Sequence, residues 1–85
     1  MKFNATVHVF RKHDVLNPEE PQTLQALHKL GFKNMESIKM GKVFCVTVES
    51  SDGVQAEGEV YNACHRLLVN MVTDTFHIEQ IKPAT

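Results

Sequence analysis

The sequence predicts an α+β domain, in which a four-stranded antiparallel sheet carries two helices on one of its faces. Residues 2–11 alternate apolar and polar side chains, which is typical of a half-buried strand. Residues 43–49 form an unbroken β-favouring run. Two further segments, 21–30 and 53–70, carry apolar residues at the spacing of amphipathic helices. Helices of this kind must bury their apolar stripes, and a sheet face provides the surface.

The length and composition indicate one small soluble domain, residues 1–85. A chain this short buries only about 60–65% of its unfolded surface, so a partner would improve its stability. The net charge of −1 gives no electrostatic basis for binding nucleic acid or an anionic membrane, both of which require clustered Lys and Arg. There is no apolar stretch of the roughly 20 residues that a membrane span needs, nor the apolar segment of a signal peptide. We therefore expect a cytoplasmic protein.

The first strand points its apolar side chains to one face: Phe3, Ala5, Val7 and Val9. The connection after it contains the turn-initiating pair Asn17-Pro18. It ends at Pro21, which suits the first position of a helix because the missing N–H costs nothing there. The sequence leaves open whether the helix begins near Pro18 or at Pro21.

The first helix has a clearly marked end. Its apolar stripe consists of Leu24, Leu27 and Leu30, and Gly31 follows as a left-handed residue. Phe32 can then fold back on Leu27, as in a Schellman motif. We expect the helix to stop at Leu30.

The middle of the chain predicts a hairpin around which the sheet is built. Residues 33–40 form a short strand, and Gly41-Lys42 forms a tight turn because Gly accepts the positive φ of short hairpin connections. Residues 43–49 form the second arm, with apolar or small side chains on both faces. A strand of that kind belongs near the middle of a sheet, so we expect it to be a central strand.

The second helix begins after Asp52, which can accept a hydrogen bond as its N-cap, and Asn70 marks its end. Its apolar stripe comprises Val60, Cys64, Leu67, Leu68 and Met71. Residues 76–82 form the last strand. Ile81 breaks the alternation of that strand, which predicts a bulge or a two-sided edge.

These elements follow the order β-α-β-β-α-β, the strand order of ferredoxin-like folds. Two helices on one face leave the other face of the sheet uncovered. Phe10 and one face of residues 43–49 are apolar there. We therefore expect the chain to oligomerise through its sheet, as a homodimer or a tetramer.

The side chains that could carry chemistry do not form a recognisable site. The five histidines lack the spacing of a metal site, and the two cysteines, Cys45 and Cys64, form no CxxC pair and are expected to be buried free thiols. Glycine-rich phosphate loops and a GxSxG nucleophile are missing from the sequence. We expect no catalytic, cofactor-binding or metal-binding residue on this chain.

Basic residues gather at the predicted turn. Lys39 and Lys42 flank it, and Arg11 and Lys12 end the first strand. The simpler interpretation is that these charges only keep a loop soluble. The alternative is a basic corner that docks on an acidic partner.

Four stretches of the sequence together resemble one family. They are Val15 to Pro18 (V-L-N-P), Leu24 to Phe32 (L-Q-A-L-H-K-L-G-F), Ile38 to Lys42 (I-K-M-G-K) and Cys64 to Val72 (C-H-R-L-L-V-N-M-V). In this combination they resemble the PurS family, the small subunit of phosphoribosylformylglycinamidine synthase, from end to end. The chain departs from the family pattern at Glu20-Pro21, where a glycine is common, and at Lys39, where Arg is common.

The resemblance implies a non-catalytic subunit in de novo purine biosynthesis. It would bridge the glutaminase subunit (PurQ) and the large synthetase subunit (PurL) and assist ammonia transfer between them. ATP and magnesium would be used by the large subunit, with no cofactor on this chain. The expected partner interface combines the loop residues Asn17 and Pro18 with the corner residues Lys39, Gly41 and Lys42. The alternative function is an ACT-like regulatory module that binds a metabolite.

Overall fold

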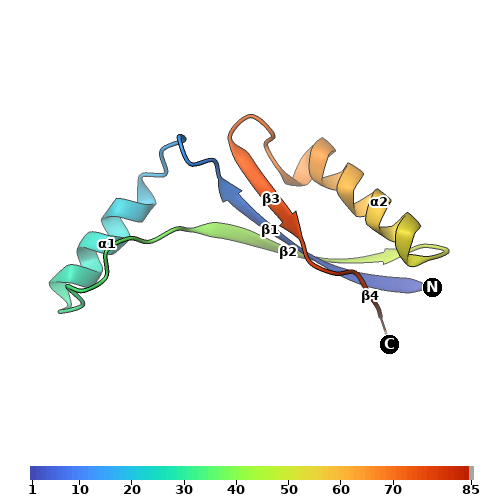
Figure 1. Ribbon diagram of the computed structural model, residues 1–85, viewed down its shortest axis with the longest axis horizontal. Coiled ribbons are helices and arrows are strands. Elements are labelled where there is room, and N and C mark those ends of the chain that lie inside the picture. The colour runs from blue at the N-terminus through green and yellow to red at the C-terminus, as the bar shows by residue number, and fades with distance from the viewer. Residues whose placement is uncertain (85) are drawn as a thin grey trace.

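A computed structural model describes residues 1–84 of the chain. The elements in chain order are β1 (Lys2–Arg11), α1 (Glu19–Lys29), β2 (Gly41–Glu49), α2 (Gly53–Ala63), the π-helical turn η1 (Cys64–Leu68), β3 (Asp74–Ile78) and β4 (Lys82–Pro83). The four strands form one sheet, and every pairing in it is antiparallel. The predicted α+β class, with four antiparallel strands and two helices, is confirmed (Figure 1).

The centre of the sheet is β1 rather than the predicted strand 43–49. β1 pairs with β2 along one side and with β3 and β4 along the other. This leaves β2 at an edge of the sheet (Figure 1). Because β1 is ten residues long, it offers enough backbone for two short strands to pair one after the other on the same side.

The predicted hairpin at Gly41-Lys42 is wrong. Residues 33–40 form no strand, and Gly41 instead opens β2 directly opposite Phe10 of β1. A Cβ on Gly41 would collide with the carbonyl oxygen of Val9 and with the ring of Phe10. Gly41 is therefore required by the close approach of β1 and not by a turn. Among residues 1–84, only Gly31 has a positive φ.

The core lies between one face of β1 and helix α2. The apolar face of β1 is buried as predicted, and Val7, Val60 and Cys64 are fully buried. Phe44, on the same face of β2, pairs with Val7 and packs at the border of this core. The predicted alternation of β1 is confirmed, whereas β2 is covered on one face only, because Val43, Cys45 and Thr47 on its other face are exposed.

Helix α2 begins as predicted, because the Asp52 carboxylate accepts a hydrogen bond from the Gln55 backbone N–H at 2.8 Å. Its end differs from the prediction. The chain continues into the π-helical turn η1, whose wider turn rotates the following side chains away from a straight stripe. Leu67 is 84% exposed and Met71 is also exposed, so their predicted place in the core is wrong. Val69 is buried instead.

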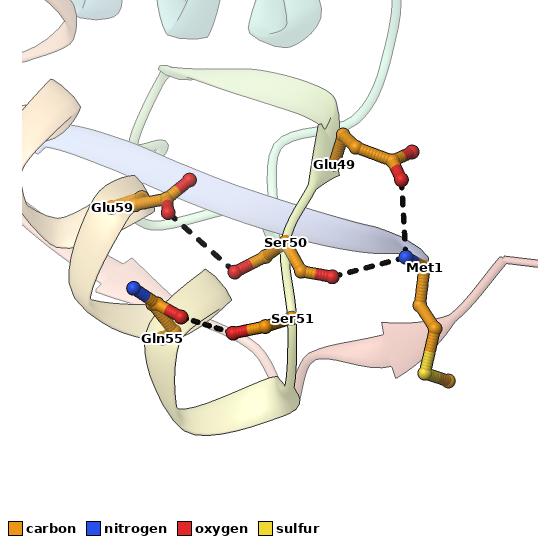
Figure 2. Close-up of polar contacts among 6 residues, drawn as sticks. All are labelled: Met1, Glu49, Ser50, Ser51, Gln55 and Glu59. Atoms are coloured by element: carbon orange, nitrogen blue, oxygen red, sulfur yellow. Dashed lines mark hydrogen bonds and ion pairs between the residues drawn. The ribbon is translucent and has the colours of Figure 1, made fainter.

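The junction of β2 and α2 is closed by polar contacts (Figure 2). The buried Ser50 donates its hydroxyl to the carboxylate of Glu59 at 3.5 Å, and the Ser51 hydroxyl contacts Gln55. The terminal amine of Met1 donates to the Ser50 carbonyl at 3.1 Å. These contacts fix the direction in which α2 leaves the sheet.

The predicted last strand is divided into β3 and β4, with an extra residue between them. Val7 pairs with Ile78, whereas Asn4 pairs with Lys82. Two residues of β1 therefore face three residues, 79–81, which is a one-residue bulge. Of the two outcomes predicted from Ile81, a bulge or a two-sided edge, the structure shows the bulge.

Helix α1 begins at Glu19, with Pro18 as its N-cap, which decides between the two predicted starts. Its end is the predicted Schellman motif: Phe32 N–H donates to the Leu27 carbonyl at 3.0 Å, and Gly31 N–H donates to the His28 carbonyl at 3.1 Å. Both predictions about this end are confirmed.

α1 does not cover the sheet, in contrast to the prediction that both helices share one face. It has no buried residue, and it lies beyond the ends of β1 and β2 (Figure 1). The reason is that residues 33–40 form no strand, so the chain runs outward along α1 and returns without pairing. The molecule measures 51 × 30 × 14 Å with a radius of gyration of 16.6 Å. A compact domain of this length has a radius of about 12 Å.

Candidate functional site

The residues predicted as a partner interface meet where α1 joins the sheet, a region we call the arm junction (residues 10–20 and 37–42). Asn17, Gly41 and Lys42 line a first groove of about 450 Å³. Lys39 lines a second groove of about 340 Å³. Pro18 caps α1 and is exposed. The fold therefore brings together two segments that are about twenty residues apart in the sequence.

Hydrogen bonds tie the two connecting segments to the start of α1. Glu20 accepts from the Met40 backbone N–H at 2.6 Å, and Asn17 Oδ1 accepts from the Glu19 N–H at 3.1 Å. Arg11, at the end of β1, donates from Nη1 to the Leu16 carbonyl at 3.4 Å. The arm junction thus holds α1 by polar contacts rather than by a buried apolar core.

Phe10 organises the centre of the arm junction. Its ring packs across Gly41, and the Lys39 ammonium lies 5.7 Å from the ring centroid, within the range of a cation–π contact. Lys42 follows Gly41 on β2 and points to the first groove. The sequence placed Phe10 on the polar face of its strand, and the structure explains this position by its contact with glycine.

The two grooves differ in charge. The first is mixed, because Glu19 and Asp74 line it together with Arg11 and Lys42. The second is predominantly basic and is lined by Arg11, Lys12, His13 and Lys39, with Glu20 as its acidic residue. Glu20 is already engaged by the Met40 N–H. In residues 1–84, the ion pairs are Met1–Glu49 and His8–Glu79. The lysines and Arg11 of the junction therefore form no ion pair with another described residue.

Sequence reasoning missed one wall of the first groove. Asn70, Thr73 and Asp74, from the connection before β3, line it. Asn70 shapes this connection, since its Oδ1 accepts from the Val72 N–H at 3.0 Å and its carbonyl accepts from the Asp74 N–H at 2.7 Å. Asn70 lies in the motif that the sequence shares with the PurS family, which was the available signal.

Histidines also meet on the open face of the sheet, where the sequence gave no signature. His8 and His77 are cross-strand partners with ring centroids 6.3 Å apart, and His8 Nε2 lies 2.6 Å from Glu79 Oε1. Within residues 1–84, no group of three or more His, Cys, Asp or Glu side chains is arranged to hold a metal ion. His8 and His77 are 69 positions apart in the sequence, so their spacing could not reveal that they are cross-strand neighbours.

The two cysteines occupy different environments. Cys64 is buried, and this burial raises the pKa of its thiol above the usual value. Cys45 is exposed, so the prediction that both thiols are buried is wrong for it. The cause is the edge position of β2, whose open face no element of the described chain covers.

None of the helices in residues 1–84 has the length and apolar character that a membrane crossing requires.

Comparison with known proteins identifies the family. The family model PurS, described as phosphoribosylformylglycinamidine (FGAM) synthase, matches residues 4–82. The FGAM synthase subunit PurS of Archaeoglobus fulgidus is 36% identical over 74 residues, which cover 87% of this chain and 92% of the relative. These matches favour the synthase subunit over the ACT-like alternative.

Solved structures agree with the fold. The crystal structure of Methanocaldococcus jannaschii PurS has a TM-score of 0.85 at 29% identity, covering 98% of this chain and 99% of that one. The PurS fold in the PurLQS structure from Thermotoga maritima has a TM-score of 0.88 at 22% identity, over 94% and 98% of the two chains. The chain therefore belongs to the PurS family, the small subunits of FGAM synthase in purine biosynthesis.

Proposed function

We propose that this chain bridges the glutaminase subunit (PurQ) and the large synthetase subunit (PurL) of the FGAM synthase complex and assists ammonia transfer between them. The observation that carries the proposal is the match of the family model to residues 4–82, almost the whole chain. The PurLQS assembly of Thermotoga maritima, which contains the same fold, supports partners of these two kinds.

The physical reason for a bridging subunit lies in the chemistry of ammonia. Ammonia released into bulk water is protonated and lost as a nucleophile, so the two active sites need a junction that excludes water. The chain would supply rigid surface for this junction and no catalytic group. ATP and magnesium would be bound by the large subunit. We place this work in the cytoplasm, as a homodimer or tetramer.

We assign partner docking to the arm junction. Lys39 and the other cations of the second groove form no ion pair within the described residues, so an acidic surface on a larger subunit fits them. Such contacts increase the association rate and the specificity more than the affinity. Asn17, Pro18 and Gly41 would shape the contact from the adjoining loop and strand.

Reconstitution with the glutaminase and large synthetase subunits of the same organism tests this role. We expect glutamine-dependent FGAM formation to require this chain, and ammonia-dependent formation by the synthetase to be much less affected. Glutamine-dependent activity of undiminished rate without the chain would refute the proposal.

A charge reversal tests the docking surface separately. The double variant Lys39→Glu/Lys42→Glu should lower glutamine-dependent activity at least tenfold at limiting concentrations of the chain, and excess chain should partly restore it. Lys82→Glu, on β4 away from the arm junction, is the matched control and should leave activity unchanged. Equal activity of both variants would exclude the arm junction as the docking surface.

A further inference from the structure

The second groove of the arm junction gathers positive charges from two separate segments of the chain. Arg11 and Lys12, at and after the end of β1, line it together with Lys39, which precedes β2. None of these cations forms an ion pair with another residue of the described chain. Lys12 is half-buried, and the attraction between an ammonium and an anion grows as both leave water. The groove therefore has unused affinity for an anion.

The acidic side chains nearby do not cancel this charge. Glu20 is the acidic residue among those lining the groove, and its Oε2 already accepts a hydrogen bond from the Met40 N–H at 2.6 Å. Asp14 lies close in sequence, but it is exposed and does not line the groove. Three cations against one carboxylate leave an excess of two positive charges when His13 is neutral.

Both walls of the groove are held in place within the chain itself. On one wall, the Lys39 ammonium lies 5.7 Å from the centroid of the Phe10 ring, in a cation–π contact. On the other wall, the Lys12 N–H donates to the Thr73 carbonyl at 2.8 Å, and the Lys12 carbonyl accepts from the Val15 N–H at 2.9 Å. An anion that enters a site held in this way loses less free energy to the ordering of its surroundings.

The lining residues favour phosphate groups. The Arg11 guanidinium can bind a phosphate through two parallel hydrogen bonds, and lysines bind phosphate as point charges. Ser37 adds a hydroxyl to the lining. The volume of about 340 Å³ exceeds that of a single phosphate, and the cations on its two walls fit a chain of phosphates that spans it. No Phe or Tyr of the described chain lines the groove, so it offers no surface on which a base would stack.

We propose that the second groove binds the polyphosphate chain of a nucleoside di- or triphosphate through Arg11, Lys12 and Lys39, and does not recognise the base. Inorganic tripolyphosphate shares this chemistry and should bind as well. Because the site lies inside the arm junction, bound polyphosphate competes with the acidic subunit surface that docks there. Only this competition rests on the proposed function, since binding itself requires the chain alone.

Titration of the whole, ¹⁵N-labelled chain, followed by its amide NMR signals without magnesium, tests the site. Tripolyphosphate, ATP and GTP should all shift signals in residues 11–13 and 37–39 saturably. Their dissociation constants should agree within about threefold, because the base makes no contact. Inorganic phosphate should bind roughly tenfold more weakly or less, since it reaches fewer cations, and added salt should weaken all four ligands. Binding of ATP or GTP without binding of tripolyphosphate would overturn the proposal, because the base would then carry the affinity.

A charge-matched pair of variants separates the groove from the net charge. Lys12→Gln/Lys39→Gln should raise the dissociation constant of tripolyphosphate by about tenfold or more, because two charge-assisted contacts are lost. Lys2→Gln/Lys82→Gln removes the same charge at the other end of the sheet and should change it less than about twofold. Equal affinity of the two double variants would refute the site, as would the lack of a saturable shift in the native chain.

Association of the chain with the glutaminase and large synthetase subunits distinguishes this inference from the proposed function. At matched ionic strength, saturating tripolyphosphate should lower the fraction of chain bound to them at least fivefold. Binding of tripolyphosphate to the chain with unchanged association would support the phosphate site and refute docking at this groove. Normal association of a chain that does not bind tripolyphosphate would overturn the phosphate site and leave the bridging role standing.

Discussion

Replacing Gly41 with alanine tests why this residue must be glycine. The added methyl group would meet the Val9 carbonyl oxygen and the Phe10 ring. The ring can rotate away, but the carbonyl belongs to the ladder between β1 and β2 and cannot move without disturbing it. Overpacking of this kind costs about 1–3 kcal/mol, and a backbone obstacle places Gly41→Ala near 2–3 kcal/mol.

Thermal unfolding at a fixed protein concentration measures this cost. In a domain of 60–100 residues each kcal/mol lowers the Tm by about 4–8 °C, so Gly41→Ala should lower it by roughly 10–20 °C. Phe10→Ala combined with Gly41→Ala should recover about 1 kcal/mol, because the ring contact is then absent. The recovery should be partial, since the Val9 carbonyl remains.

Gly58→Ala is the matched control, because a Cβ there would have no heavy atom within 4 Å. Gly58 lies inside α2, where alanine should stabilise the protein by about 0.5–1 kcal/mol. The two identical chemical changes should thus have opposite signs. If Gly41→Ala is neutral or stabilising, the close approach of β1 does not require glycine, and our account of this position is wrong.

Four further predictions concern local structure and the thiols. Gly31→Ala should cost about 1–3 kcal/mol in urea unfolding, because φ at this residue is +104°; unchanged stability would exclude the Schellman end. Asp52→Ala should cost about 1 kcal/mol by loss of the bond from Gln55 N–H, and Asp52→Asn should restore most of it. Cys45 should react with a thiol reagent at once and Cys64 only on unfolding. Burial raises the pKa of the Cys64 thiol. The stability that depends on the neutral thiol should therefore be present at neutral pH and be lost as the pH rises above the normal pKa range of a thiol. The variant Cys64→Ala should not show this pH dependence.

Local signals in the sequence predicted local structure well. The end of α1 at Gly31 and the start of α2 after Asp52 each depend on one or two hydrogen bonds between near neighbours, so the sequence contains all the information they need. The inward face of β1 follows from its alternation alone. The bulge at Ile81 was likewise visible as a break in that pattern.

Contacts between distant segments were harder to predict. Glycine is expected both in a tight turn and where two strands approach each other closely. Only the position of Phe10 shows that Gly41 is the second case. The π-helical turn η1 moves Leu67 out of a stripe that looks continuous in the sequence. At the arm junction, the sequence identified Asn17 and Lys42 but not Asp74, because the far wall of the groove depends on the order of the strands.

The misplacement of β2 is informative in itself. Its composition, with apolar or small side chains on both faces and no charge between Lys42 and Glu49, is typical of a strand in the middle of a sheet. Its position within one chain is at the edge. The composition that misled the topology prediction therefore reports how apolar β2 is, and not which strand lies at the centre of the chain's own sheet.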